Sequence, residues 1–284
     1  MKIFYKDINL KNYFCSRDNV TYINNEKPLI NLYVQLTPNC NAKCYFCDTR
    51  NCNNIFDFEK FKLIIEELDE KIHLGKIAIT GGEPLLELDK IIKIIDNYKD
   101  RYLTLNTNAY DIEKLKMIYS YFKEVHISKH HFDNNKNDEI MKIKTPTLFD
   151  LYQNNLVKNT KINCVFQKGY METKNDIVQM MEKMSLYQLK ELRCISLLPL
   201  TQEGINHYVC LDDLMKECEY FMNDDYLYDK SHCKCFEFIY IANNGQLIKN
   251  LIRQTYNDNY SCVKQLVYDG KYLYDGFKKN NIIF

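Results

Sequence analysis

The chain has 284 residues, of which 38 are basic and 38 acidic, so its formal net charge is zero. That length allows one large α/β domain or one domain with a smaller appendage. The balanced charge excludes a general attraction to nucleic acid or to anionic membranes, and neither partner is expected.

The first residues, MKIFYKDINLKNYF, are interrupted by charges and lack the apolar core of a secretory signal. No run reaches the eighteen or so apolar residues of a membrane span. We therefore expect a cytoplasmic protein, with residues 1–29 as an N-terminal segment. In a reducing compartment, the twelve cysteines are expected to be thiols or metal ligands rather than disulfides.

Short β-branched runs alternate with amphipathic stretches from residue 30 onward. The predicted strands are 30–36, 76–80, 102–106, 125–128, 161–166 and 191–197. Helical spacing of apolar residues predicts helices at 56–68, 88–98 and 112–122, and another that begins after the cap residue Thr173. Six such units imply an α/β fold with a parallel sheet over residues 30–200. This is a partial (β/α)6 barrel, because a closed eightfold barrel needs about 250 residues.

The pattern changes after residue 200. A helix is predicted at 211–222, and Asn244-Gly245 and Asp269-Gly270 lie between apolar runs. Such pairs are typical of β-hairpin turns, so strands are expected at 233–243, 246–251, 266–268 and 272–274. Residues 201–284 are therefore predicted to form a small β-rich C-terminal extension.

Three cysteines follow the first predicted strand in the pattern C-x3-C-x2-C: Cys40, Cys44 and Cys47. Cys52 is close but follows a different spacing. A structural zinc site would be closed by four ligands, commonly in paired C-x2-C elements. An iron–sulfur cluster held by three thiolates would instead keep one iron open for a substrate or cofactor.

The segment ITGGEPLLE (79–87) ends the second predicted strand. Gly81 and Gly82 would let the backbone approach a ligand closely, and the Glu83 carboxylate could receive an ammonium group. By itself the segment could equally be an ordinary strand-to-helix turn, with Pro84 starting the helix.

Taken together, these motifs resemble those of the radical S-adenosylmethionine (radical SAM) enzymes. The resemblance rests on the cysteine triplet with Phe46 before its last member, and on residues 80–84. LNTNAY (105–110) is similar to the third-strand motif T-N-G, with Ala109 where glycine is usual. VHISKHH (125–131) is similar to the next strand, and KINCVFQKG (161–169) to the corresponding strand of molybdenum-cofactor-type members.

The resemblance implies that Cys40, Cys44 and Cys47 bind a 4Fe–4S cluster whose open iron takes the amine and carboxylate of SAM. Reductive cleavage of SAM would give a 5′-deoxyadenosyl radical, which abstracts hydrogen from a substrate. A reductant such as flavodoxin or ferredoxin is then a partner. The residues expected to contact SAM are Phe46, Gly81, Gly82, Glu83, Pro84, Asn108 and Ser128, with Asn163 and Leu198 as weaker candidates.

Two further groups of residues have more than one interpretation. His130 and His131 could donate a proton or contact substrate at the barrel rim, or could be solvated loop residues. Some radical SAM enzymes carry a C-terminal SPASM or twitch extension that holds an auxiliary iron–sulfur cluster. The tail cysteines Cys210, Cys218, Cys233 and Cys235 could form such a site, although the usual C-x2-C-x5-C-x3-C run is absent and they could be purely structural.

The substrate is predicted to be a peptide or a small metabolite. CDT (47–49) with TGGEPLL is also similar to 7-carboxy-7-deazaguanine synthase, in which case Thr49 would help to hold Mg2+. A glycyl-radical activating enzyme is a second alternative. A metal-binding module that recognises a partner protein is the non-enzymatic alternative.

Overall fold

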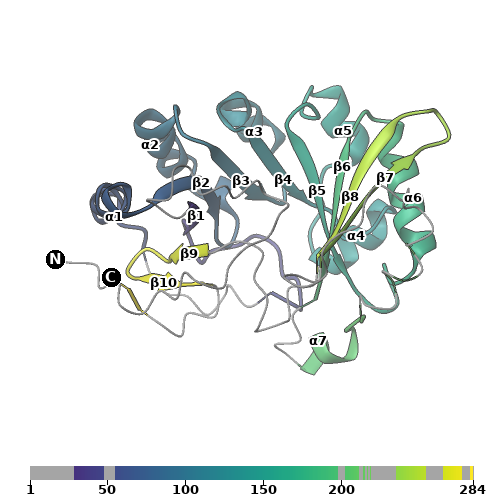
Figure 1. The fold of residues 1–284 in the computed structure, drawn as a ribbon. Coiled ribbons are helices and arrows are strands. Elements are labelled where there is room, and N and C mark those ends of the chain that lie inside the picture. Colours follow the sequence, from purple (N-terminus) through teal and green to yellow (C-terminus); the bar gives the residue numbers. More distant parts are fainter. Residues whose placement is uncertain are drawn as a thin grey trace.

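The computed structural model describes residues 29–47, 55–197, 202–210, 235–253, 265–276 and 282–283, together with residues 214, 216 and 218. The described strands form one sheet in the order β10-β9-β1-β2-β3-β4-β5-β6-β8-β7. Helices cover the convex side of this curved sheet (Figure 1). Within the described residues β10 and β7 are the two edges, so the sheet is an open partial barrel.

The elements alternate along the chain up to β6. The strands are β1 (Leu29–Gln35), β2 (His73–Thr80), β3 (Leu103–Thr107), β4 (Glu124–Ser128), β5 (Thr160–Phe166), β6 (Glu191–Ser196), β7 (Cys235–Ile241), β8 (Leu247–Arg253), β9 (Gln265–Tyr268) and β10 (Leu273–Asp275). The α-helices are α1 (Phe58–Lys71), α2 (Leu88–Tyr98), α3 (Ile112–Ile118), α4 (Asn134–Met141), α5 (Leu148–Gln153), α6 (Lys174–Ser185) and α7 (Gln202–Asn206). The 3-10 helices among the described residues are η6 (Pro84–Glu87) and η7 (Tyr119–Tyr121).

Strands β1 to β6 lie side by side in chain order, and every neighbouring pair is parallel. Parallel neighbours need a crossover connection, and helices supply it between each of these pairs. The predicted α/β class and the partial barrel are therefore confirmed.

The predicted C-terminal strands are present, and they extend the main sheet at both edges. The β7–β8 hairpin turns at Asn244 and Gly245, and β8 pairs in parallel with β6. At the other edge β9 pairs in parallel with β1, with Asn31 opposite Gln265, and β10 folds back on β9. A domain boundary near residue 200 remains a prediction.

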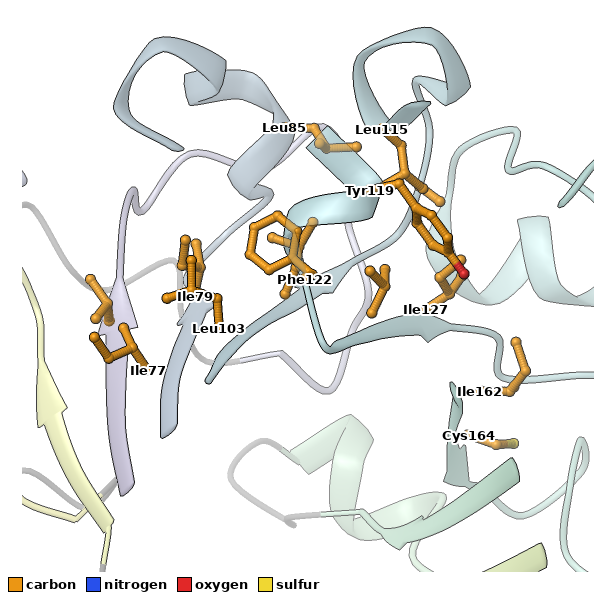
Figure 2. Packing of buried hydrophobic residues seen from close by; sticks show 14 of the residues in the cluster. Ile77, Ile79, Leu85, Leu103, Leu115, Tyr119, Phe122, Ile127, Ile162 and Cys164 are labelled. Carbon is orange, nitrogen blue, oxygen red and sulfur yellow. The ribbon is translucent and has the colours of Figure 1, made fainter. Parts of the chain in front are cut away.

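The core lies between the sheet and the helices. Helix α1 shows how local sequence builds it: Asp57 caps the helix by accepting from Lys60 N, and its buried side chains follow helical spacing. Figure 2 shows the strand residues Ile77 and Leu103 on the side where the helices pack. Burying a large apolar side chain of this kind contributes about 1.5–3 kcal/mol. None of the described helices combines the length and apolar character needed to cross a bilayer.

The opposite side of the sheet is called the inner face below. Side chains alternate between the two faces of a strand, and Val125, Ile127, Ile162 and Leu192 belong to the core on the helix side. Their neighbours in the strands therefore lie on the inner face, which carries polar and charged groups. The inner-face residues used below are Asn106 and Asn108, Glu124, His126 and Ser128, Lys161 and Asn163, and Glu191 and Arg193.

Candidate cofactor and active site

The three cysteines lie in the loop that follows β1, beyond the carboxyl end of the strand. Cys44 is buried and Cys40 and Cys47 are half-buried. The loop is anchored to the end of α4, where Lys43 N donates to Met141 O (2.9 Å). All three cysteines pack in one small cluster whose other members are Ala42, Phe46, Met141 and Ile143. Three cysteine side chains are thus gathered where the carboxyl ends of parallel strands collect functional groups.

The glycine pair after β2 holds this cysteine loop directly. Gly82 N donates to Thr37 O (2.6 Å) and Glu83 N to Asn39 O (2.8 Å). A Cβ on Gly82 would lie 2.0 Å from Asn39 O, and one on Gly81, whose φ is +130°, would lie 2.5 Å from Thr37 O. The sequence predicted that the glycines make room for a ligand. In the structure the space beside them is filled by the loop that carries the cysteines.

Glu83 links the ends of β2 and β3. Its carboxylate accepts hydrogen bonds from Leu85 N (3.0 Å), Thr107 Oγ1 (2.6 Å) and Asn108 N (2.8 Å). Burial raises the pKa of Glu83, although these donors oppose the shift. Pro84 begins η6, as predicted. The contact between Glu83 and the SAM amine remains a proposal.

Asn108 connects β3 to the cysteine loop. Its Nδ2 donates to Asn41 Oδ1 (2.9 Å), and the same oxygen lies 4.0 Å from Cys40 Sγ. The next residue, Ala109, has a φ of +58° and is fully buried. This left-handed backbone explains why the motif that it resembles has glycine there. Sequence reasoning missed Asn41, and its only signal was its position next to Cys40.

Ser128, the last residue of β4, lies opposite Asn163 in the middle of β5. Asn163 Oδ1 is buried and has no hydrogen-bond partner within the described part of the chain. Buried polar atoms in folded proteins are almost always paired. This oxygen can therefore accept a hydrogen bond from a hydroxyl or amine of a bound molecule, and a SAM ribose or amine fits that requirement.

Phe46 packs the cysteine loop against the segment that follows β4. Its ring meets the His130 ring edge-on, with centroids 5.1 Å apart. The neighbouring Tyr45 hydroxyl donates to Gln167 Oε1 (2.5 Å). Both His130 and His131 are buried, so the interpretation of this pair as solvated loop residues is wrong. Covering by Phe46, which the sequence did not predict, explains part of the burial of His130.

The other predicted site residues are not gathered at the cysteine loop. Leu198 and Cys233 lie outside the described residues. Cys210 is exposed, whereas Cys218 is fully buried in the main core. Cys235 is the first residue of β7. Across the described ranges, no group of three or more His, Cys, Asp or Glu side chains is arranged to hold a single metal ion. The auxiliary cluster remains a prediction, and the burial of Cys218 favours a packing role for that cysteine.

The tail can be tested by removing the first cluster. In the triple variant Cys40→Ala, Cys44→Ala, Cys47→Ala, only an auxiliary cluster could retain iron. We expect about four irons per chain and a brown colour after anaerobic reconstitution and desalting, since a cubane holds four irons. Iron and sulfide analysis measures this. A folded but colourless variant would show that the tail cysteines are structural.

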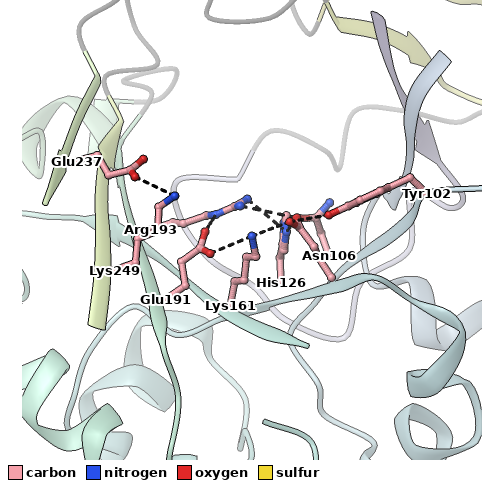
Figure 3. Close-up of polar contacts among 9 residues, drawn as sticks. Tyr102, Asn106, His126, Lys161, Glu191, Arg193, Glu237 and Lys249 are labelled. Carbon is pink, nitrogen blue, oxygen red and sulfur yellow. Dashed lines mark hydrogen bonds and ion pairs between the residues drawn. The ribbon is translucent and has the colours of Figure 1, made fainter. Parts of the chain in front are cut away.

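An ion cluster spans β4, β5 and β6 on the inner face (Figure 3). We call Glu124, Lys161, Glu191 and Arg193 the inner-face ion cluster. Lys161 Nζ lies 2.6 Å from Glu124 Oε1 and 2.9 Å from Glu191 Oε2. Arg193 Nε lies 2.8 Å from Glu191 Oε1, and its terminal nitrogen lies 3.7 Å from Glu124 Oε2. Each cation therefore has two carboxylate partners.

His126 lies within this cluster as a neutral ring. Its Nε2 is 2.8 Å from Glu124 Oε2, and its Nδ1 is 3.0 Å from Asn106 Oδ1. Burial, together with the charge of Arg193, lowers the pKa of His126 to about 4, although Glu124 opposes the shift. Burial would raise the pKa of Glu124, but the hydrogen bonds from His126 and Lys161 and the nearby cations hold it far below its usual range.

This histidine should make the fold less stable in mild acid. Below its ordinary pKa of 6.5 the unfolded chain binds a proton at His126, whereas the native state does so only near pH 4. The stabilisation is present above pH 6.5 and is lost as the pH falls toward 4, by about 3 kcal/mol in total. Urea denaturation from pH 7 to pH 4 measures it. In the variant His126→Gln, the free energy of unfolding should fall less between pH 7 and pH 4. An equal fall in the variant and the wild type would contradict the prediction.

The fold and the site together define a class of protein: an open parallel α/β sheet with a three-cysteine cluster site beyond its first strand. The family model described as the Radical SAM superfamily matches residues 34–184. The chain belongs to the radical SAM superfamily, whose members are enzymes that use a 4Fe–4S cluster and SAM together with a reductant.

Curated relatives are named as one kind of enzyme. A GTP 3′,8-cyclase of Aliarcobacter butzleri is 32% identical over 169 residues, which cover 53% of this chain and 50% of the relative. A probable GTP 3′,8-cyclase of Thermoplasma volcanium is 27% identical over 214 residues, covering 67% of this chain and 62% of the relative. The chain thus matches only about half to three fifths of the length of these two proteins.

Solved structures share the fold. SuiB of Streptococcus suis bound to S-adenosylmethionine has a TM-score of 0.61 and 17% identity, over 86% of this chain and 59% of that one. A radical SAM methyltransferase from Sphaerobacter thermophilus has a TM-score of 0.57 and 12% identity, over 86% and 70%. At this level of identity the likeness concerns the fold alone.

Proposed function

We propose that this chain cleaves SAM reductively at a 4Fe–4S cluster and abstracts hydrogen from a peptide or small-metabolite substrate. The observation that carries the proposal is the direct contact between the cysteine loop and the turn at Gly81 and Gly82. Backbone hydrogen bonds thus join the glycine turn to the loop that carries the cysteines, although the two motifs are distant in sequence. A reductant such as flavodoxin or ferredoxin would supply the electron.

Different residues of the site would bind the cluster and SAM. Cys40, Cys44 and Cys47 would hold the cluster, which together with SAM supplies a carbon radical for hydrogen abstraction when both are bound. Beside Ser128, Asn163 Oδ1 offers an acceptor that has no partner among the described residues. The Phe46 ring packs beside the cysteines and edge-on against His130, and this apolar contact would help to keep water from the site.

The alternatives have different support. The names of the curated relatives make cyclisation of GTP a second candidate reaction. The Mg2+ site expected of a deazaguanine synthase would involve Thr49, which lies outside the described residues. A glycyl-radical activating role would need a large protein partner. Membership of an enzyme superfamily argues against the non-enzymatic module.

The test is anaerobic reconstitution with iron and sulfide, followed by SAM and dithionite. We expect 5′-deoxyadenosine and methionine, measured by mass spectrometry. In a screen with deuterated peptides and metabolites, transfer of deuterium into deoxyadenosine would identify the substrate class. A fully loaded, reduced protein that forms no deoxyadenosine with any substrate would refute the proposal.

A further inference from the structure

The inner-face ion cluster shares the inner face with the residues proposed to contact SAM and lies toward the amino ends of β4, β5 and β6. On three adjacent strands, a polar or charged residue stands two positions before such a residue: Asn106 before Asn108, His126 before Ser128, and Lys161 before Asn163. Side chains two residues apart project from the same face about 6.6 Å apart. A substrate that reacts with SAM-derived chemistry at the strand ends would therefore lie over or beside this cluster.

The cations of this cluster are already neutralised. Lys161 contacts both Glu124 and Glu191, and Arg193 contacts Glu191 through its Nε. The four side chains are between 13% and 20% exposed, so water screens these pairs only partly. Two cations and two carboxylates give the cluster no net charge.

The surrounding inner face adds little positive charge. His126 is neutral at pH 7. On the neighbouring strands Lys249 pairs with Glu237 (2.8 Å). Among the inner-face residues whose side chains the structure describes, Lys76 of β2 is the remaining cation, and it is half-buried. A triphosphate carries about four negative charges near pH 7 and needs several donors that are not already bound to carboxylates.

We propose that Glu124 and Glu191 set the substrate specificity of the inner face by pairing with Lys161 and Arg193. The inner face then binds an uncharged or zwitterionic substrate, such as a peptide segment, and rejects nucleoside triphosphates. The inference rests on the proposed function for the position of the substrate. A polyphosphate would have to displace the existing ion pairs, and the freed carboxylates would repel it. Repulsion of the wrong ligand is a common source of binding specificity.

Binding measurements test this inference without any turnover. Titration calorimetry of GTP into the reconstituted protein with SAM should show no saturable binding below a Kd on the order of 1 mM. The double variant Glu124→Gln, Glu191→Gln should bind inorganic tripolyphosphate at least about tenfold more tightly than the wild type, since both cations lose their carboxylate partners. Adding Arg193→Gln should remove that gain.

A control separates this effect from a change in overall charge. Glu59 and Glu66 are exposed on α1, so Glu59→Gln, Glu66→Gln changes the net charge equally and should leave tripolyphosphate binding unchanged. If the double variant does not fold, the single variant Glu191→Gln and the wild-type GTP titration still decide. A micromolar Kd of the wild type for GTP, or a folded double variant without the gain, overturns the inference. Deoxyadenosine formation is measured separately, so failure of the proposed function is distinguishable.

Discussion

Replacing Cys44 with alanine should abolish both the iron–sulfur cluster and the formation of 5′-deoxyadenosine. Cys44 is the buried member of the triplet, at 9% exposure, and it packs in the cluster of residues that surrounds Cys40 and Cys47. Two remaining thiolates do not make up the three-cysteine set that a cubane with an open iron needs. The variant should lose about four irons per chain. The wild type should hold about four, or about eight if an auxiliary cluster is present.

The control for this experiment removes a different thiol. Cys164 is fully buried in β5 on the helix side of the sheet, in the main core. Cys164→Ala should cost about 1 kcal/mol of stability through lost packing and should keep the iron and the SAM cleavage. Native deoxyadenosine formation by a folded Cys44→Ala protein would contradict the assignment of the cluster site.

Gly82→Ala should displace the cysteine loop, and with it the cluster. The added Cβ would lie 2.0 Å from Asn39 O, 2.5 Å from Asn39 C and 2.8 Å from Pro38 O, all of them backbone atoms. No rotamer change can relieve such a contact, so the hydrogen bond from Gly82 N to Thr37 O must break or the loop must move. We expect a loss of about 3 kcal/mol or more, together with poor iron incorporation.

The matched control is Gly245→Ala, in the β7–β8 turn. Gly245 has a φ of +80°, and apart from its chain neighbours no atom of the described residues lies within 4 Å of an added Cβ, so this change tests backbone strain without a clash. It should cost only about 1 kcal/mol and should keep the cluster. Urea unfolding and iron analysis of both variants give the comparison. A Gly82→Ala protein with native stability and iron would show that the turn does not hold the loop.

Local patterns predicted much of this protein. Period-two and helical spacing located six parallel strands, and the two hairpin turns located four more. The spacing of the cysteines and the glycine pair predicted the candidate cluster site, since each of those motifs is contiguous in sequence. The capping prediction at Thr173 is also confirmed, because its side chain accepts from Asp176 N.

Long-range pairing could not be predicted in the same way. Glu124, Lys161 and Glu191 begin or nearly begin three different strands, so alternation indicates a shared face. Which of them meet depends on register between the strands, which the sequence of one strand does not contain. The same reason explains why the sequence did not predict what the glycines pack against. Their actual neighbour, the loop at 37–39, is about forty residues earlier in the chain.

The pairing of β1 with β9 has a consequence for the order of assembly. β1 leads directly into the cysteine loop, yet its partner on one side is residues 265–268. Until that late segment has been synthesised, one edge of β1 keeps open backbone donors and acceptors, which can pair with other chains. The strand that leads to the cysteine loop is thus completed only after residues 265–268 have been synthesised. Early release or truncation before Gln265 exposes an aggregation-prone edge beside the cysteines.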